Sequence, residues 1–336
     1  MVARLAWLVA TLVLGVGAAQ AGTLEQVRER GNITCGVSAG MPGLSETGSA
    51  GAWSGLFPDF CRAVAAAVFA DPARVQFVPI TENERLAALR AGEIDILAHP
   101  GAWSFSNDTQ PGVHFVGALY YEGFGLMVPQ RLGVATALEL SGADICAVEG
   151  APEALHIADY FRRNDMPYRL VRFAQASDAL QAYDAGRCDV FAGDIASLDA
   201  QREALASPEA HMVLGDVIGV APLGPAVRTG DPQWARIVRW TLFALIAAED
   251  MGLASDTIDN AAASDSALAR RFIGVEGALG QRLGLDPKWA YNVVTTVGNY
   301  RELFARNLGD ESPLGRERRL NQLWREGGLL SAPTFH

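Results

Sequence analysis

Short apolar runs alternate with amphipathic runs along most of this chain. Apolar runs of four to eight residues predict buried strands, and apolar positions spaced as in Phe60, Val64 and Val68 predict helices packed on a sheet. The expected strands cover 33–37, 75–79, 94–97, 113–118, 125–128, 143–148, 169–173, 188–191 and 213–220, and the expected helices include 59–70, 83–90, 154–163, 177–184 and a segment from 231 to 252. This alternation predicts an α/β fold.

A short sequence pattern occurs twice. Ala91-Gly92-Glu93-Ile94-Asp95-Ile96 is echoed by Ala185-Gly186-Arg187-Cys188-Asp189-Val190, and each copy follows a helical run that ends at its glycine. Two such units predict two similar α/β lobes. We expect the first lobe at 22–127, the second at 128–219, and a return to the first lobe with a helical C-terminal extension at 220–336.

Polar side chains follow the ends of several expected strands, which is where α/β lobes present groups to a ligand. In the first lobe the loop after 94–97 carries His99, Ala102, Trp103, Ser104 and Asn107. In the second lobe the corresponding loop carries Gly150, Pro152 and Glu153, and a further strand ends at Asp194. A carboxylate such as Asp194 either receives a ligand ammonium group or caps the next helix, and the sequence leaves both alternatives open.

The N-terminal residues have the features of an export signal. Arg4 precedes an apolar run at 5–16 and the small-x-small sequence Ala19-Gln20-Ala21, so we expect cleavage after Ala21 and a periplasmic product. No later run has the roughly 18 apolar residues that a membrane span requires. The net charge of −11 argues against a nucleic-acid partner.

Four cysteines in an exported chain favour disulfides, although four buried thiols remain an alternative. Sequence alone allows three pairings. If the chain divides into lobes as expected, the bridges are Cys35–Cys61 and Cys146–Cys188, which leave the lobes free to move. The spacing matches no zinc site, no phosphate-binding loop or catalytic serine motif is present, and we expect neither a metal nor a cofactor.

Several longer runs resemble one family, the periplasmic general L-amino-acid-binding proteins of ABC importers, in the polar amino-acid branch of solute-binding proteins. The resemblance covers nearly the whole mature chain. The matching runs are Cys35-Gly36-Val37, Trp53-Ser54-Gly55, Asp59-Phe60-Cys61-Arg62-Ala63-Val64, Ala158-Asp159-Tyr160-Phe161, Ala182 to Val190, Pro222 to Arg228, Arg239 to Ala244 and Trp289-Ala290-Tyr291-Asn292. It implies a type II periplasmic-binding-protein fold, with two lobes joined by two crossing strands and closing on a ligand.

The ligand-binding positions depart from the pattern of that family. The arginine that grips the ligand carboxylate corresponds to Asn107, and the loop Arg-Asn-Thr-Thr-Trp-Thr corresponds to the segment from His99 to Ser104. The second-lobe loop Gly-Thr-Thr-Thr-Glu corresponds to Gly150-Ala151-Pro152-Glu153-Ala154, which has lost its hydroxyls and gained a negative charge. Asp194 matches the acid that holds the ligand ammonium. Only the ammonium side of the amino-acid clamp remains.

The resemblance therefore implies the solute-binding component of an amino-acid-type ABC importer, a monomer that delivers its ligand to permease subunits. Two ligand classes stay open: a cationic or amine-bearing molecule without a carboxylate, or an amino acid if His99 replaces the arginine. A sensory binding module is an alternative function. A second alternative is an enzyme resembling cyclohexadienyl dehydratases, with His99 and Glu153 as acid or base.

Overall fold

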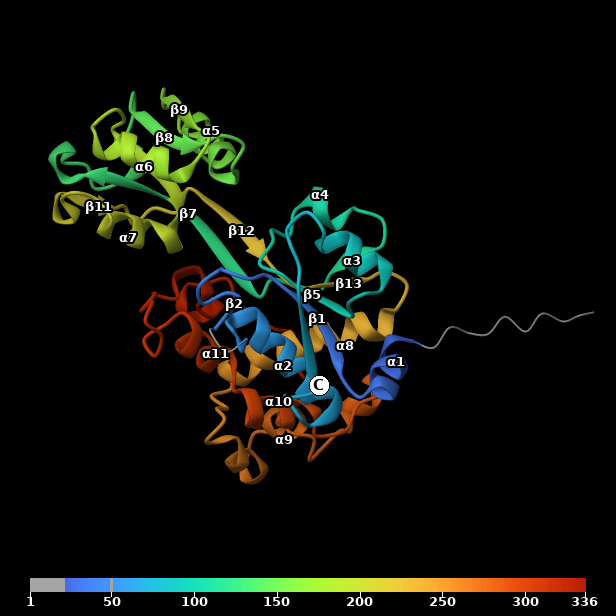
Figure 1. Ribbon diagram of the computed structural model, residues 1–336. Helices are drawn as coiled ribbons and strands as arrows, with labels where there is room; N and C mark the ends of the chain where they lie inside the picture. The colour runs from blue at the N-terminus through green and yellow to red at the C-terminus, as the bar shows by residue number, and fades with distance from the viewer. Residues whose placement is uncertain (1–21, 49–50) are drawn as a thin grey trace, which may run out of the picture.

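A computed structural model describes residues 22–48 and 51–336 of the chain, as two sheet-centred lobes joined by a pair of strands (Figure 1). The signal segment and its cleavage site lie outside the described residues. The two-lobe α/β fold expected from the sequence is confirmed. None of the helices in the described ranges is long and apolar enough to cross a membrane.

The first lobe is built on a five-stranded sheet in the order β4-β1-β5-β13-β6. β1 is parallel to both β4 and β5, while β13 is antiparallel to β5 and β6. The strands are β1 (Ile33–Val37), β4 (Val75–Pro79), β5 (Ile96–Ala98), β6 (Val113–Phe115) and β13 (Ala226–Arg228), with a small hairpin of β2 (Glu46–Thr47) and β3 (Trp53–Ser54). The carboxyl ends of β1, β4 and β5 therefore lie at one edge of the sheet.

The second lobe has the strand order β11-β7-β10-β8-β9, with β12 also paired to β7. β8 is parallel to β9 and β10, whereas β7 is antiparallel to β10, β11 and β12. The strands are β7 (Tyr120–Pro129), β8 (Asp144–Val148), β9 (Arg169–Phe173), β10 (Val190–Asp194), β11 (His211–Val213) and β12 (Gly219–Leu223).

β7 and β12 carry the chain between the lobes as an antiparallel ribbon, which Figure 1 shows running from one lobe to the other. The ribbon pairs Tyr120 with Leu223 and Phe124 with Gly219. Two expectations about these strands were wrong: β7 begins at Tyr120 rather than at 125, and 213–220 is not one strand, since β11 ends at Val213 and β12 begins at Gly219. The expected lobe boundaries after 127 and 219 lie within β7 and β12 and stay a prediction.

The helices follow the amphipathic runs of the sequence and cover the sheets. They are α1 (Thr23–Arg30), α2 (Leu56–Phe69), α3 (Arg85–Ala91), α4 (Phe105–Asp108), α5 (Pro152–Arg163), α6 (Ala176–Asp184), α7 (Ile195–Glu203), α8 (Pro232–Asp250), α9 (Ala267–Phe272), α10 (Trp289–Val297) and α11 (Tyr300–Asn307). Short 3-10 helices lie at Gln130–Leu132, Ala137–Glu139, Pro208–Ala210, Ile258–Ala263, Leu279–Leu283, Arg319–Asn321 and Trp324–Glu326.

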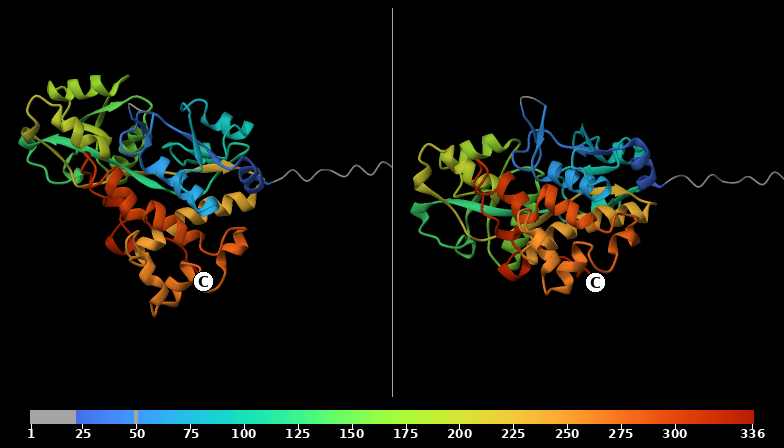
Figure 2. Two further views of the ribbon diagram at one scale, coloured as in Figure 1. Left: turned by 60° about the horizontal axis from the view of Figure 1, so that its bottom comes forward. Right: turned by 90° about the horizontal axis from the view of Figure 1, so that it is seen from below.

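The C-terminal extension packs on the first lobe, where α2, α8, α10 and α11 share one apolar core (Figure 2). The buried carboxylate of Asp59 on α2 accepts hydrogen bonds from Arg306 and Asn307 of α11, each at 2.8 Å. Farther along, the side chain of Asn321 bonds both backbone groups of Tyr121 on β7, at 2.7 and 3.0 Å. The extension thus reaches from the first lobe to the crossing ribbon.

The repeated motif has the same structural role in each lobe. α3 ends at Gly92 before β5, and α6 ends shortly before Gly186 and β10. The Asp95 carboxylate accepts a hydrogen bond from the N–H of Thr34 at 2.7 Å, and Asp189 does the same for Asp144 at 3.0 Å. The shared aspartate therefore joins the start of a neighbouring parallel strand, β1 or β8, to the strand that follows the motif, β5 or β10.

Each lobe also contains one disulfide. Cys35 on β1 is bonded to Cys61 on α2, and Cys146 on β8 is bonded to Cys188 just before β10. This is the pairing expected from the division into lobes, and the alternative of four free thiols is wrong. Because neither bridge joins one lobe to the other, both leave the ribbon of β7 and β12 free to bend.

Candidate ligand-binding cleft

The first lobe contributes the carboxyl ends of β1, β4 and β5, which surround a hollow of about 430 Å³. Ser38, Glu82 and His99 line it, together with Ala39, Met41, Pro79, Ile80 and Thr81. In an α/β lobe, a ligand site usually lies where the ends of adjacent strands meet, as they do at this hollow. His99 is the predicted site residue that the structure places there.

His99 is buried, and its ring lacks the charge that a substitute for an arginine needs. Burial lowers the pKa of His99 to about 4; Glu82 opposes this shift and Arg85 adds to it. The imidazole is therefore neutral near pH 7, although Nδ1 lies 3.5 Å from a Glu82 oxygen. Arg85, which lies near His99, is itself buried and paired to Glu82 at 2.6 Å. These properties argue against His99 as the cation that replaces the carboxylate-binding arginine.

The remaining first-lobe candidates hold the loop together. The Asn107 amide donates a hydrogen bond to the carbonyl of Ala102 at 2.8 Å, and the Ser104 hydroxyl caps α4 by accepting from the N–H of Asn107. Trp103 stacks on Phe115 and donates its backbone N–H to Pro222 of the crossing ribbon. These contacts give the loop a fixed shape, and the side chain at position 107 is an amide bonded within that loop.

In the second lobe, the loop after β8 leads into the N-terminus of α5, which begins at Pro152. Gly150 has a φ of +75°, a conformation that glycine adopts without strain. The free N–H groups at the start of a helix normally attract an anion. Here the Glu153 carboxyl, in the first turn of α5, interacts with its own N–H and with that of Val148. An acidic side chain of the protein itself therefore lies where an anion would bind.

Glu153 and Asp194 lie within electrostatic reach of each other. Burial raises the pKa of the Glu153 carboxyl, and the nearby Asp194 raises it further, against the two backbone hydrogen bonds. Asp194 caps α7 through one carboxylate oxygen, which accepts from the N–H of Ser197 at 2.8 Å. Asp194 therefore caps the next helix, as one of the two alternatives predicted. The cap uses only one of its two carboxylate oxygens. No hydrogen bond or ion pair joins these acids to the first-lobe candidates in the described part of the chain.

A third acid, absent from the sequence prediction, belongs to this group. Glu122 lies on the crossing strand β7, and burial raises its pKa to about 8, with Asp194 adding to the effect and Arg316 opposing it. Its carboxyl group lies beside the N–H of Ala196, at the start of α7. The sequence signal that would have identified it is a glutamate inside an otherwise aromatic, apolar and glycine-rich strand.

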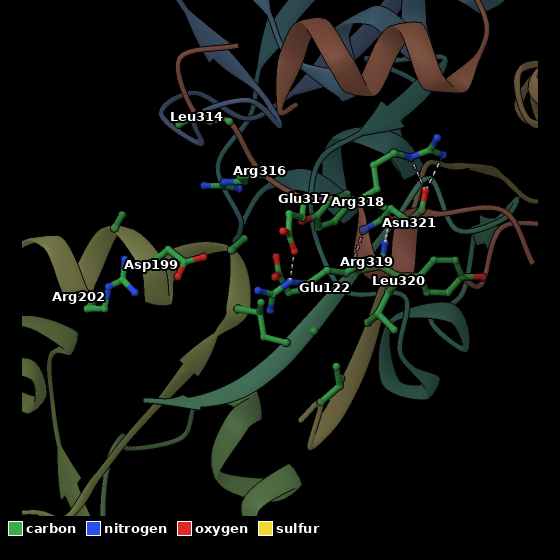
Figure 3. Close-up of a pocket in the computed structure, with 18 of the residues that line it drawn as sticks. Glu122, Asp199, Arg202, Leu314, Arg316, Glu317, Arg318, Arg319, Leu320 and Asn321 are labelled. Carbon is green, nitrogen blue, oxygen red and sulfur yellow. Dashed lines mark hydrogen bonds and ion pairs between the residues drawn. The ribbon is translucent and has the colours of Figure 1, made fainter. Parts of the chain in front are cut away.

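Glu122 and its neighbours line a cavity of about 600 Å³ beside the crossing ribbon (Figure 3). One wall is α7, with Asp199 and Arg202, and the opposite wall is the C-terminal segment 313–321. Residues of this segment were expected to be part of a helical tail and were not predicted to approach the site. No cluster of three or more histidine, cysteine or acidic residues that could hold a metal ion is found in residues 22–48 and 51–336.

Comparison with known proteins finds one family and several full-length relatives. The family of bacterial extracellular solute-binding proteins, family 3, matches residues 33–256. The general L-amino acid-binding periplasmic protein AapJ of Rhizobium johnstonii is 44% identical over 326 residues, covering 96% of each chain. The glutamate/glutamine/aspartate/asparagine-binding protein BztA of Rhodobacter capsulatus is 40% identical over 97% of each.

A solved structure is also similar along most of the chain. It is an ABC transporter periplasmic binding protein from Brucella ovis with glutathione bound, 42% identical, with a TM-score of 0.76. The match covers 94% of this chain and all of that one. The similarity therefore includes the C-terminal extension as well as the two lobes.

Proposed function

Because this chain belongs to the bacterial extracellular solute-binding proteins of family 3, we propose that it captures a small amine-bearing solute between its lobes for an ABC importer. The relatives at 40 to 44% identity are named as amino-acid-binding proteins, which supports binding rather than catalysis as the function. This is the importer function expected from the sequence; the dehydratase alternative has no such support.

The proposed class of ligand rests on one observation. The Glu153 carboxylate occupies the N-terminus of α5, so a ligand carboxylate cannot use those N–H groups without displacing it and meeting its charge. The position of the missing arginine holds Asn107, whose amide is bonded within its own loop. Both anion-binding elements of the clamp are therefore replaced, while Asp194 keeps a carboxylate oxygen for an ammonium group.

The test is calorimetric titration of mature protein that has been unfolded and refolded to remove bound solute. We expect pentylamine or cadaverine to bind more tightly than L-alanine or L-glutamate. Asp194→Asn should weaken amine binding about thirtyfold or more, the effect of removing one partner of a buried charge pair. Asparagine caps helices as well as aspartate does, so the variant keeps the start of α7. Asp178→Asn, at an exposed acid in the first turn of α6, is the matched control.

A second pair of variants tests the role of Glu153 directly. Asn107→Arg alone should leave L-amino acids weakly bound, whereas Asn107→Arg combined with Glu153→Gln should bind them at least about tenfold more tightly than the natural chain. Tight binding of L-amino acids to the unaltered protein, insensitive to Glu153→Gln, would contradict the proposal.

The partners and processing follow from the same proposal. We propose that permease subunits in the membrane receive the solute and that the protein acts as a monomer, because one chain supplies both halves of the cleft. The family is extracytoplasmic; cleavage after Ala21 is our prediction, and the intact mass of the exported protein tests it.

A further inference from the structure

The cavity beside the crossing ribbon has two independently held walls. Tyr120, Tyr121 and Glu122 of β7 form part of its lining, α7 of the second lobe forms one wall and the C-terminal segment 313–321 forms the other. Its volume of about 600 Å³ lies within the range of small-molecule sites. Figure 3 shows Arg316 extending from the C-terminal wall toward the side of α7.

The wall that carries Arg316 is anchored at that residue and on its C-terminal side. Arg318 forms a two-point ion pair with the buried carboxylate of Glu249, at 2.5 and 3.0 Å, and Asn321 bonds the backbone of Tyr121. The backbone N–H of Arg316 itself donates to the carbonyl of Leu308 at 2.7 Å. The guanidinium therefore starts from a fixed backbone, which lowers the entropy cost of engaging a ligand.

Arg316 differs from the other arginines that line the cavity. Arg202 pairs with Glu203, Arg318 with Glu249, and Arg319 with Glu317. Across residues 22–48 and 51–336, no carboxylate lies within ion-pair distance of the Arg316 guanidinium, which lies near the hydroxyl of Tyr120. Arg316 is thus the cation of this cavity that has charge available for an anion.

Glu122 gives the cavity its second polar feature. One carboxyl oxygen, Oε1, is buried and lacks a hydrogen-bond partner within the described ranges. Since the pKa of Glu122 is raised to about 8, the carboxyl is neutral near pH 7 and does not cancel the charge of Arg316. Asp194 directly precedes Ile195, which lines the cavity, and pairs with Phe124 on β7, two residues from Glu122. This places the proposed ammonium position next to the cavity.

We propose that Arg316 of the C-terminal extension binds the carboxylate of a ligand whose ammonium group is held at Asp194. The ligand class is an aminocarboxylate with the two charges at opposite ends of a chain, rather than on one carbon as in an α-amino acid. This inference rests on the proposed function, since it places the amine at the same acid. Arg316 takes over the role of the arginine that Asn107 has replaced, from a different part of the fold.

The experiment compares three probes of equal chain length by calorimetry at pH 7: 5-aminovalerate, pentylamine and pentanoate. The natural protein should bind 5-aminovalerate at least about tenfold more tightly than pentylamine. Pentanoate should bind most weakly of the three. Arg316→Gln should weaken the binding of 5-aminovalerate on the order of thirtyfold and leave the binding of pentylamine unchanged. Arg319→Gln is the matched control, because Arg319 lines the same cavity but pairs with Glu317. This variant should bind 5-aminovalerate and pentylamine as the natural protein does.

The outcomes separate this inference from the function on which it rests. If pentylamine binds in an Asp194-dependent way, but 5-aminovalerate binds no better or is insensitive to Arg316→Gln, the carboxylate site is wrong and the proposed function stands. If Arg316→Gln weakens the binding of pentylamine and of 5-aminovalerate equally, the arginine stabilises the structure of the site rather than binding the carboxylate, and the inference is also wrong. If no amine-bearing probe binds, both proposals are overturned.

Discussion

Replacing the buried acid of the crossing ribbon should change how the stability of the protein depends on pH. The perturbation is Glu122→Gln, which removes the ionisable group and keeps an oxygen to accept the N–H of Ala196. Burial raises the pKa of Glu122 from 4.5 to about 8, and the charged groups that face it are Asp194, which raises it further, and Arg316, which lowers it. The phenol of Tyr120 also lies near Arg316 and stays protonated.

The direction of the effect follows from proton binding. Between about pH 4.5 and 8 the native protein keeps a proton on Glu122 that the unfolded chain has released, so the stability contributed by this group falls as the pH rises through that window and is lost above pH 8. The two pKa values differ by about 3.5, and each pH unit corresponds to about 1.4 kcal/mol, so the loss is on the order of 5 kcal/mol.

The assay is urea unfolding of the disulfide-intact, ligand-free protein at pH 5 and pH 9, followed by tryptophan fluorescence. At pH 5 the variant and the natural protein should differ by less than about 1 kcal/mol, whereas at pH 9 Glu122→Gln should be more stable by several kcal/mol. Glu317→Gln, at an exposed acid lining the same cavity, should show no such pH-dependent difference. Equal pH dependence of the natural protein and Glu122→Gln would refute the reasoning.

Three further substitutions test contacts of the fold. Asp95→Ala should destabilise the first lobe by about 2 to 4 kcal/mol in urea unfolding, because it leaves a buried strand N–H without its acceptor; Asp95→Asn, which keeps an acceptor, should cost less. Removing the Cys146–Cys188 bridge with serine at both positions should cost about 3 to 4 kcal/mol for its separation of 42 residues, without changing ligand affinity. Gly224→Ala should cost about 3 kcal/mol, since its Cβ would lie 1.9 Å from a backbone carbonyl oxygen, whereas Gly215→Ala, with open space around it, should be close to neutral.

The repeated helix, glycine and strand motif predicted the two lobes because it is local: the glycine ends a helix and the aspartate bonds a neighbouring strand. The crossing strand was less predictable. Tyr120 and Tyr121 have no local partner, and they belong to β7 because β12, about a hundred residues later, pairs with them. The strand propensity of a short stretch of sequence carries no information about a pairing strand so far away in the chain.

For the candidate site, the sequence singled out His99, Glu153 and Asp194 as site residues, which stays a prediction, and it could not predict their states. Neutral His99 results from burial, and the pKa of Glu153 is raised by burial in the folded protein. Arg316 was out of reach of any local pattern, because the contacts that fix its segment, such as Asn321 to Tyr121, join residues 200 positions apart.

The carboxylate of Glu153 at the start of α5 also determines which solutes can compete. A group attached to the backbone beside its binding position has an effective concentration far above the millimolar levels that free anions reach. Under the proposed function, dissolved acids at ordinary concentrations would displace it only rarely, so the start of α5 excludes them before any ligand binds. Exclusion of anions from this position of the second lobe is then a property of the empty protein and does not depend on the concentration of organic acids around it.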